Sequence, residues 1–591
     1  MGIKISNQEI GDILREVSEY LEMDSVPFKP RAYEKAAAAV EALNEDVAGV
    51  YKQGGLKAVE EIPGVGVSIA EKIEELIKTG KLEYYEELKK RIPVDLKTLS
   101  SIEGLGPKHI KTLYKKLNIK NIADLEIAAK AGKIRDLEGF GKKSEENILK
   151  GIEFKKQSGN RFILGFVMPE LESIVAGLKK LKEAERVDIV GSARRKKETI
   201  GDADILAISE NPKPVMDYFV NMPGVNHIFA YGETKSAIRL KNGLEVDLRV
   251  VPKESYGAAM QYFIGSKDHN VALRRIAIKK GYKLNEYGLF KVAEQRGLKR
   301  GLTQKEIKIA GEDEKEIYKK LGMDWMPYEM RENTGEIELA QKHKLPELIG
   351  YDDLMGDLHM HSNWTDGEKS IEEMALAAMK LGRKYIAITD HTKHLAMTGG
   401  LDEQKLIKQM KIIDKLNNES RIKNSGFRVL KGSEVDILKD GTMDISDDIL
   451  KKLDVVLASV HSYFNLPKDE QTKRIIRAME NKNVDIISHP TGRLINRRAA
   501  YEIDIDAVIK AAQRTGTILE IDSFPDRLDL KDDYIRKCVE AGVKMSIDSD
   551  AHSPAHLEYL QWGIAQARRG WATKNDIINC WSLEKMLKML K

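Results

Sequence analysis

Sequence signals for disulfides, membranes and strong overall charge are scarce in this chain of 591 residues. Its only cysteines, Cys538 and Cys580, cannot build a disulfide framework and fit a reducing compartment. No run of about 18 apolar residues and no secretory signal pattern is present. The net charge is only +4, so the charge total gives no sign of nucleic-acid binding. We therefore expect a cytoplasmic protein with no membrane partner.

The chain has the composition of a globular protein and enough residues for several domains. Hydrophobic residues make up 42% and charged residues 32%, and the length suggests about three to five domains. Charge is unevenly distributed, because residues 251–300 contain 11 Lys and Arg against 4 Asp and Glu. A local basic surface of this kind attracts phosphate backbones, so nucleic acid is a candidate partner despite the near-neutral total.

Two aspartates follow a short apolar strand at 187–190 and are spaced as neighbours on one face of a strand. Gly201 precedes Asp202, and Asp204 follows with one residue between them. Side chains alternate along a strand, so the two carboxylates project the same way. They repel each other unless a cation lies between them. Oxygen ligands at this spacing suit Mg²⁺, which also takes ligands from substrate phosphates.

A phosphate-binding turn and a third carboxylate accompany this pair. Gly191 and Ser192 can offer backbone N–H groups and a hydroxyl to a phosphate, and Arg195 can add a charged fork. The apolar alternation at 244–250 predicts a neighbouring strand on which Asp247 faces away from the valines and leucine. Three aspartates on adjacent strands are typical of a two-metal site for in-line phosphoryl transfer.

This region resembles the nucleotidyltransferase palm of family X DNA polymerases, and the segment at 262–266 with Asn270 and Arg274 matches the nucleotide-binding segment of that family. The resemblance implies two Mg²⁺ or Mn²⁺ ions on the catalytic residues Asp202, Asp204 and Asp247. It implies nucleotide contacts from Gly191, Ser192, Arg195, Gly201, Tyr262, Phe263, Gly265 and Asn270. Arg249 and Arg274 would contact primer and template. Lys267 and Val271 differ from the mammalian relatives, so template handling is expected to differ.

The first part of the chain contains three copies of a hairpin motif between short helices. Apolar periodicity predicts helices over 10–21 and 36–43. Paired glycines then precede amphipathic stretches within 61–73, 101–108 and, less regularly, 137–143. Such turns often only join helices, but their N–H groups can meet a phosphate at a helix N-terminus. Three copies favour sequence-independent DNA binding, with backbone contacts from Gly64, Gly66, Gly104, Gly106 and Lys108.

This hairpin region resembles the lyase and hairpin domain that precedes the palm in the same family. By that resemblance Lys72 is a catalytic residue that forms a Schiff base with C1′ of an abasic sugar. A lysine can do so only if its amine is partly deprotonated by burial or by neighbouring cations. Lys72 equally fits a solvated position on an amphipathic helix, and Ser68 replaces a phosphate-binding Lys of the mammalian enzymes.

The last part of the chain repeats an apolar strand that ends in a metal-ligand type of residue. Nine of the twelve histidines lie beyond residue 340, and helical stretches such as 371–381 and 506–513 separate the strands. Repeated strand–helix units with polar strand ends predict a parallel barrel whose site lies at the carboxyl ends of the strands. His359 and His361 share one strand face and can chelate one ion, and histidine with carboxylate suits Mn²⁺, Zn²⁺ or Fe²⁺.

These strand ends resemble the PHP (polymerase and histidinol phosphatase) domain over about residues 351–575. The nine matching ligand positions are His359, His361, Asp366, His391, Glu434, His461, His489, Asp550 and His552. Family geometry implies three ions, with Mn²⁺ expected and Zn²⁺ or Fe²⁺ as alternatives. Such a cluster lowers the pKa of a bridging water and clamps phosphate oxygens, so phosphoester hydrolysis is the expected outcome. Arg493 is a candidate phosphate clamp.

The expected fold is multidomain α/β, with the following order. Residues 1–90 form an all-α helix–hairpin–helix, lyase-like domain, and 91–154 a second helix–hairpin–helix subdomain. Residues 155–253 form the palm with a mixed sheet, and 254–335 a small α+β thumb. Residues 336–350 are a linker, and 351–591 form a distorted TIM-like (β/α) PHP barrel.

Together the segments resemble bacterial and archaeal family X polymerases with a fused PHP domain. The resemblance implies a monomer that fills gaps in gapped or primed DNA with dNTPs during base-excision-type repair. It also implies a Mn²⁺-dependent 3′–5′ exonuclease and cleavage at abasic sites. Three alternatives are a metal phosphoesterase whose first half only binds DNA, a non-catalytic repair scaffold, and a terminal transferase that needs no template.

Overall fold

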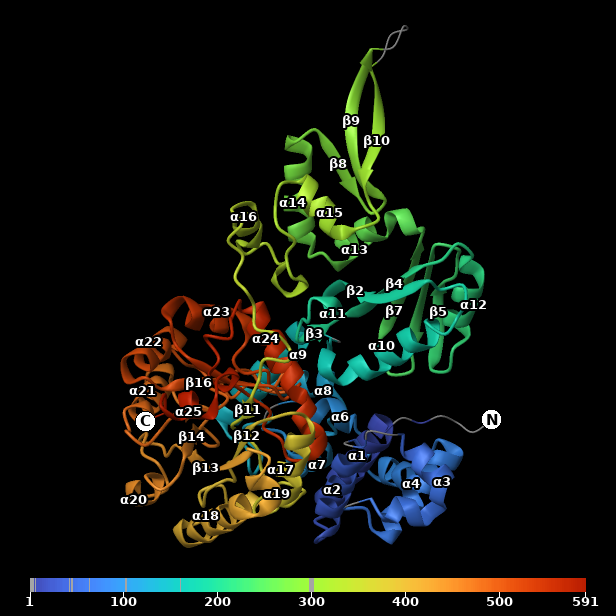
Figure 1. The fold of residues 1–591 in the computed structure, drawn as a ribbon. Coiled ribbons are helices and arrows are strands. Elements are labelled where there is room, and N and C mark those ends of the chain that lie inside the picture. The colour runs from blue at the N-terminus through green and yellow to red at the C-terminus, as the bar shows by residue number, and fades with distance from the viewer. Residues whose placement is uncertain are drawn as a thin grey trace.

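A computed structural model describes residues 5, 7–41, 43, 46–62, 64–100, 102, 104–159, 161–296 and 302–590. The chain forms four successive regions: a helical region, a palm sheet, a thumb and a barrel (Figure 1). The thumb lies at one end of the molecule, and the barrel and the helical region lie together at the other. None of the helices in the described part of the chain has the length and apolarity that a bilayer crossing requires.

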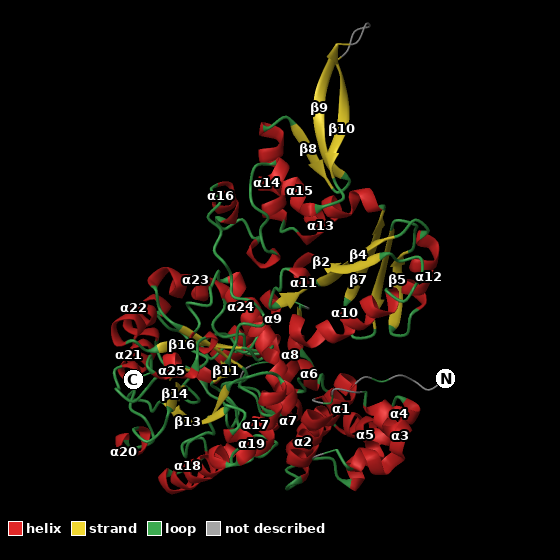
Figure 2. Ribbon diagram, in the orientation of Figure 1, coloured by secondary structure: helices red, strands yellow, loops and turns green. Residues whose placement is uncertain are grey.

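The N-terminal region consists of helices (Figure 2), which pack around one apolar core. That core joins residues from both expected subdomains, for example Leu14, Ile73 and Ile110, so residues up to about 152 pack as one unit. The helices are α1 (Asn7–Met23), α2 (Lys29–Glu41), α3 (Val47–Glu60), α4 (Val67–Thr79), α5 (Glu83–Arg91), α6 (Leu96–Ser100), α7 (Pro107–Leu117), α8 (Ile122–Lys130) and α9 (Lys142–Ser158).

The three hairpin turns share one backbone geometry. Their first glycines, Gly64, Gly104 and Gly139, have φ of 87°, 83° and 84°, a left-handed conformation that favours glycine. The next residue donates its N–H to the carbonyl three positions earlier at 3.0–3.1 Å, in the pairs Val65 to Ile62, Leu105 to Ile102 and Phe140 to Leu137. The third copy therefore has the same turn as the other two, although its sequence is less regular.

The palm is a five-stranded mixed sheet in the order β2-β4-β7-β6-β5. Only β4 and β7 run parallel, and their alternate residues, such as Ile205 and Val246, pack with helix α10 in the apolar core. The elements are β1 (Phe162–Ile163), α10 (Leu164–Leu178), β2 (Arg186–Val190), α11 (Gly191–Arg194), β3 (Thr199–Ile200), β4 (Asp202–Ile208), α12 (Pro212–Asn221), β5 (Val225–Ala230), β6 (Lys235–Leu240) and β7 (Glu245–Val251).

The thumb is a three-stranded antiparallel sheet with helices beside it, and it extends further along the chain than expected. Its elements are η1 (Lys253–Ser255), α13 (Tyr256–Ile264), α14 (Lys267–Lys279), β8 (Tyr282–Asn285), β9 (Gly288–Arg296), β10 (Leu302–Ala310), α15 (Glu314–Lys320), η2 (Tyr328–Met330) and α16 (Glu336–Gln341). Helix α16 lies within the stretch expected to be a linker. Its Ile337 and Ala340 are buried in the thumb core, whereas Ile349 of the same stretch is buried in the barrel core.

The last region is a seven-stranded parallel sheet in the sequential order β11 to β17. A parallel bridge between Met360 and Ala551, just beyond the first and last strands, brings the sheet edges together into a nearly closed barrel. The TIM-like expectation is confirmed. The strands are β11 (Gly356–Asp357), β12 (Tyr385–Ile388), β13 (Arg428–Asp436), β14 (Val455–Ser459), β15 (Ile486–Ile487), β16 (Ile518–Asp522) and β17 (Met545–Asp548).

Helices surround the barrel (Figure 1). They are α17 (Ile371–Lys380), η3 (Ala396–Thr398), α18 (Glu403–Asn418), α19 (Ser420–Lys423), α20 (Asp447–Leu450), α21 (Lys468–Met479), α22 (Ile505–Thr515), α23 (Asp532–Ala541), η4 (Pro554–Tyr559), α24 (Leu560–Arg569), η5 (Ile578–Cys580) and α25 (Leu583–Leu587). Three barrel residues, Ile495, Leu528 and Trp562, are buried in the apolar core of the palm. The palm therefore packs directly on the barrel.

Candidate active sites

The three palm aspartates lie on two hydrogen-bonded strands. The parallel register places Asp204 of β4 opposite Asp247 of β7 and places Asp202 opposite Glu245. Burial raises the pKa of Asp204 to about 6, and the negative charges of Asp202 and Asp247 act in the same direction. A carboxyl group in this position releases its proton more readily when a cation is close, so the site favours cation binding.

A lysine that sequence reasoning did not identify contacts this site. Lys235 of β6 places its Nζ 2.6 Å from Asp247 Oδ2. In the described part of the chain, the compact groups whose ligand atoms lie within 4.8 Å of one another are all in the barrel. The three palm aspartates do not form such a compact group. Their negative charges repel one another, and Asp247 already pairs with Lys235.

The Gly191 turn lies directly against the aspartates. Gly191 has φ 68°, and a Cβ atom on it would lie 2.5 Å from Asp204 Oδ2. Only glycine allows this close approach without a shift of the carboxylate. Ser192 is half-buried in the short helix α11, and Gly201 lies in a hollow beside Arg239 and Glu245. The turn thus connects the expected phosphate cradle with the carboxylates.

The side chain of Arg195 is held by the thumb. Its Nε donates to Glu332 Oε1 at 3.0 Å, and its Nη1 donates to the carbonyl of Ile264. Gly265 has φ 72°, and a Cβ there would lie 3.2 Å from Nη1 of Arg195. Lys197 of the same basic cluster pairs with the same carboxylate, because its Nζ lies 3.4 Å from Glu332 Oε1.

The predicted nucleotide segment forms a connected set of aromatic and polar contacts. The rings of Tyr262 and Phe263 lie edge to face with centroids 5.0 Å apart. Arg249 lies over the Phe263 ring at 4.9 Å, and Arg274 lies over the Tyr262 ring at 5.2 Å. Asn270 is buried and donates to the Tyr262 carbonyl at 2.7 Å. The two arginines thereby border the same aromatic pair.

Lys72 is half-buried on α4 rather than enclosed in a pocket. Its Nζ donates to the carbonyl and hydroxyl of Ser68 at 3.1 and 3.2 Å and lies 5.4 Å from the centre of the Tyr84 ring. The α4 amphipathic pattern buries Ile73 and Leu76, and Lys72 lies at the edge of that buried face. The amine is therefore accessible to an abasic sugar, and both interpretations of Lys72 stay predictions.

The barrel gathers all nine of the residues that were expected to bind metal. Three compact groups have ligand atoms within 4.8 Å of one another: His361, Asp366, His391 and His552; His359, His361 and Asp550; and His391, Glu434 and His461. His489 joins them, because its Nε2 lies 2.9 Å from Glu434 Oε1. The groups share His361 and His391, so the cluster is continuous. It lies at the carboxyl ends of the strands, as parallel barrels place their sites.

The carboxylates and imidazoles of this cluster shift one another's pKa values. Burial alone would raise the pKa of Glu434, but the imidazoles of His461 and His391 outweigh it and hold that pKa well below its ordinary value. Burial lowers the pKa of His489 to about 3, and the charge of Arg527 adds to this effect. Burial would lower the pKa of His391, but the charge of Glu434 outweighs it and raises that pKa to about 10. His391 must therefore release a proton when a metal binds, whereas His489 is already neutral.

Several ligand atoms in the barrel have no hydrogen-bond partner. These buried atoms include His359 Nε2, His361 Nδ1, Glu434 Oε2 and His489 Nδ1. Unsatisfied polar atoms in an interior cost free energy, and their convergence is explained if cations complete their coordination. The donor set is imidazole and carboxylate, which fits Mn²⁺, Zn²⁺ or Fe²⁺.

Second-layer partners orient the histidines, and sequence reasoning did not identify them. Glu520 accepts from His359 Nδ1 at 2.7 Å, and Asp436 accepts from His461 Nδ1 at 3.0 Å. Glu520 lies on β16, the one barrel strand without an expected ligand. The alternation of apolar and acidic residues at 518–522 is a signal that could have revealed it. Such carboxylates fix the tautomer of a ligating histidine.

Arg493, the candidate phosphate clamp, is engaged with the palm, and its role stays a prediction. It donates to Glu198 of the palm at 2.8 Å and to the Leu528 carbonyl. The arginine that faces the metal cluster is Arg527, whose Nε lies 3.5 Å from Asp550 Oδ2. It is only partly buried and comes from the loop after β16, so sequence spacing could not distinguish it from Arg493.

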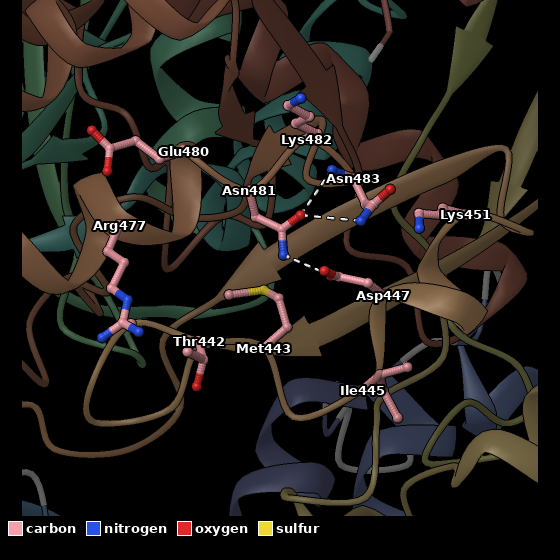
Figure 3. Close-up of a pocket in the computed structure, with 11 residues that line it drawn as sticks. Thr442, Met443, Ile445, Asp447, Lys451, Arg477, Glu480, Asn481, Lys482 and Asn483 are labelled. Atoms are coloured by element: carbon pink, nitrogen blue, oxygen red, sulfur yellow. Dashed lines mark hydrogen bonds between the residues drawn. The ribbon is translucent and has the colours of Figure 1, made fainter.

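A surface cavity of about 640 Å³ lies apart from both sites, beside α20 and the end of α21 (Figure 3). The Asn481 side chain donates to Asp447 and accepts from Asn483 at its centre. The residues that line it include no palm aspartate and none of the nine barrel ligands.

Comparison with known proteins matches four family models along the chain. Family models match a helix-hairpin-helix domain at residues 5–82, a SAM-like helix-hairpin-helix tandem at 96–153, a DNA polymerase beta thumb at 259–332 and a PHP domain at 357–524. With the two sites, these matches define a class: a nucleotidyltransferase polymerase joined to a metal-binding phosphoesterase domain.

Curated relatives identify the family more closely. The chain is 38% identical over 587 residues, 99% of each chain, to DNA polymerase/3′-5′ exonuclease PolX of Bacillus subtilis (strain 168). It is also 31% identical over 237 residues to a probable phosphatase of Thermoanaerobacter sp. (strain X514). The aligned segment covers 38% of this chain and 90% of that protein. The chain belongs to the PolX family of DNA polymerase/3′-5′ exonucleases. It is therefore a DNA polymerase with a PHP-associated exonuclease, and DNA and dNTPs are its substrates.

Proposed function

We propose that the palm fills short gaps during DNA repair by two-metal nucleotidyl transfer. The observation that carries this proposal is the register that sets Asp204 opposite Asp247 with the Gly191 turn against them. Asp202, Asp204 and Asp247 would hold two Mg²⁺ or Mn²⁺ ions, which supply charge stabilisation to the transferred phosphoryl group. Asp247 would lie nearest the primer 3′-hydroxyl, and the thumb aromatic pair would line the incoming sugar.

We propose that the barrel cluster removes nucleotides from a 3′ end. The convergence of nine imidazole and carboxylate ligands with unsatisfied buried atoms supports three Mn²⁺ ions, with Zn²⁺ or Fe²⁺ as alternatives. Bound ions would supply a water of lowered pKa and clamp the phosphate oxygens. Arg527 would add a positive charge beside the scissile phosphate, since its guanidinium borders Asp550. We further expect a monomer that acts in the cytoplasm, where DNA and dNTPs are available.

The two assignments are tested together on one gapped duplex with and without Mn²⁺. Asp202→Ala is expected to abolish extension and keep degradation, and His359→Ala is expected to do the reverse. Matched controls are Glu245→Gln, which removes the exposed acid opposite Asp202, and His394→Ala, an exposed histidine outside the cluster. Both controls should keep both activities. Extension that persists in Asp202→Ala would instead support a phosphoesterase whose first half only binds DNA.

We propose that Lys72 provides abasic-site lyase activity. The test is borohydride trapping on DNA with a 5′-deoxyribose phosphate, because reduction captures a Schiff base covalently. Lys72→Ala should lose the trapped product. Lys78→Ala, a lysine of the same helix that pairs with Glu74 at 2.9 Å, should keep it. Equal trapping in both variants would leave Lys72 as a solvated helix residue.

Template dependence separates gap filling from terminal transfer. Wild-type protein is expected to extend a primer in a gap opposite template and to extend a lone single strand much less. Equal extension of both substrates would contradict gap filling and favour a terminal transferase.

A further inference from the structure

An arginine of the PHP barrel reaches the phosphate loop of the palm. Arg569, at the end of α24, is almost fully buried and donates from Nη1 to the carbonyl of Arg195 at 2.9 Å. The same Nη1 lies 3.1 Å from Glu332 Oε1. Figure 1 shows α24 beside β3 and α11, where the palm rests on the barrel. A barrel residue thus contacts both the backbone and the side-chain partner of Arg195.

Glu332 is the common acceptor of three cations. Its Oε1 lies 3.0 Å from Nε of Arg195, 3.4 Å from Lys197 Nζ and 3.1 Å from Nη1 of Arg569. Arg569 is itself held by Asp532, whose Oδ2 accepts from its Nε and Nη2 at 2.9 and 2.6 Å. The chain of contacts therefore runs from the barrel through Glu332 to the phosphate loop.

These contacts leave one edge of Arg195 for a ligand. Its side chain is only 12% exposed, and its Nε and Nη1 are bonded to Glu332 and the Ile264 carbonyl. Within the described part of the chain, no acceptor is bonded to its Nη2. A guanidinium fixed on two sides loses little conformational freedom when the remaining nitrogen binds a phosphate oxygen.

We propose that Arg569 is a positioning residue of the polymerase site, acting through Glu332 to hold Arg195 in place for the dNTP triphosphate. The barrel then has a second role besides hydrolysis, because it completes the nucleotide site of the palm. This inference rests on the proposed contact between Arg195 and the triphosphate.

A second contact between palm and barrel, at Glu198, serves as a control for the Arg569 contact. Glu198 of the palm accepts from Arg493 at 2.8 Å and from Gln566 at 3.1 Å. It joins the same two domains but does not touch Arg195 or Glu332. Its removal would loosen the interface without a direct effect on the phosphate loop.

The experiment measures dNTP KM and kcat on a one-nucleotide gap with the full-length chain. Arg569→Gln is expected to raise the KM about three- to tenfold and to change kcat much less. The reason is that the Arg195 side chain must then be ordered when the dNTP binds. Arg569→Lys should raise the KM less than Arg569→Gln does. Its ammonium can pair with Glu332 but cannot replace the several N–H donors of the guanidinium. Exonuclease activity of the same samples should stay at wild-type level and reports correct folding.

Matched variants make the outcome decisive. Glu332→Ala leaves the Asp532–Arg569 pair intact and should raise the KM as much as Arg569→Gln, and the double variant should be no worse than either. Glu198→Gln is expected to leave the KM close to wild type. A wild-type KM in Arg569→Gln and Glu332→Ala, or an equal rise in Glu198→Gln, would overturn the positioning role.

Arg195→Ala distinguishes this inference from the proposed function beneath it. If Arg195→Ala raises the KM strongly while Arg569→Gln does not, the triphosphate contact stands and the barrel plays no part in it. If Arg195→Ala also has no effect, the triphosphate contact itself fails.

Discussion

Neutralising Asp204 is expected to stabilise the metal-free protein while it abolishes polymerisation. In the folded chain, burial raises the pKa of this carboxyl to about 6, helped by Asp202 and then Asp247. At neutral pH the ionised group therefore opposes folding. Asp204→Asn keeps the shape of the side chain and removes that charge.

The structure sets both the size and the pH range of the effect. A pKa raised from 3.8 to about 6 corresponds to about 3 kcal/mol at about 1.36 kcal/mol per pKa unit. This value already contains the opposing charges of Arg249 and Lys235, which lower the pKa of Asp204. The destabilisation is absent well below the ordinary pKa of 3.8, where the carboxyl is protonated in both states, and is complete once the pH has risen through about 6.

Calorimetry in EDTA across pH 4–8 measures this difference directly. The transition of the palm and thumb, identified as the one that Mg²⁺ shifts in wild type, should rise by up to about 6–12 °C in Asp204→Asn at pH 7.5, at about 2–4 °C per kcal/mol for a unit of this size. The gap should close toward pH 4, and Mg²⁺ should stabilise wild type only.

Asp188→Asn is the matched control with the opposite sign. Burial would raise the pKa of Asp188, but hydrogen bonds from Tyr256 and Arg186 outweigh it and lower that pKa. The ionised group therefore contributes stability above its unfolded pKa and loses it as the pH falls. Asp188→Asn should lower the transition at pH 7.5. A lowered or unchanged transition in Asp204→Asn would refute the charge-repulsion reasoning.

Three further changes test other parts of the structure. Gly191→Ala should lose most polymerase activity and keep exonuclease activity, because its Cβ would lie 2.5 Å from Asp204 Oδ2, and paired assays of the two activities check this. Glu520→Gln should weaken Mn²⁺ binding about 10- to 100-fold, measured by calorimetric titration, because His359 loses its orienting carboxylate. Arg331→Met should destabilise the thumb by about 3–5 kcal/mol in urea unfolding, because it leaves a buried carboxylate unpaired, and a loss below about 1 kcal/mol would contradict this.

Local spacing was enough to predict much of this protein. Asp202 and Asp204 share a face because strands alternate, and His359 with His361 follow the same rule. Glycines in the hairpins indicated tight turns because few other residues adopt a positive φ. Each of these signals lies within a few residues, so the sequence displays it without reference to the rest of the fold.

Other features depend on residues that are far apart in the chain. The contact of Lys235 with Asp247, and that of Glu520 with His359, join strands whose order in the sheet is not visible in their spacing. Arg493 has the residue type and position expected of a phosphate clamp, yet its guanidinium donates a hydrogen bond to Glu198 of the palm.

The sequence by itself therefore determined the local chemistry of both centres, because alternation and turn geometry act between near neighbours. Only the tertiary structure decided which carboxylate orients each histidine, which arginine faces the cluster, and that Arg569 of the barrel supports the phosphate loop. Such pairings depend on how strands align and domains pack, and thus on the free energy of the whole fold rather than on any one segment.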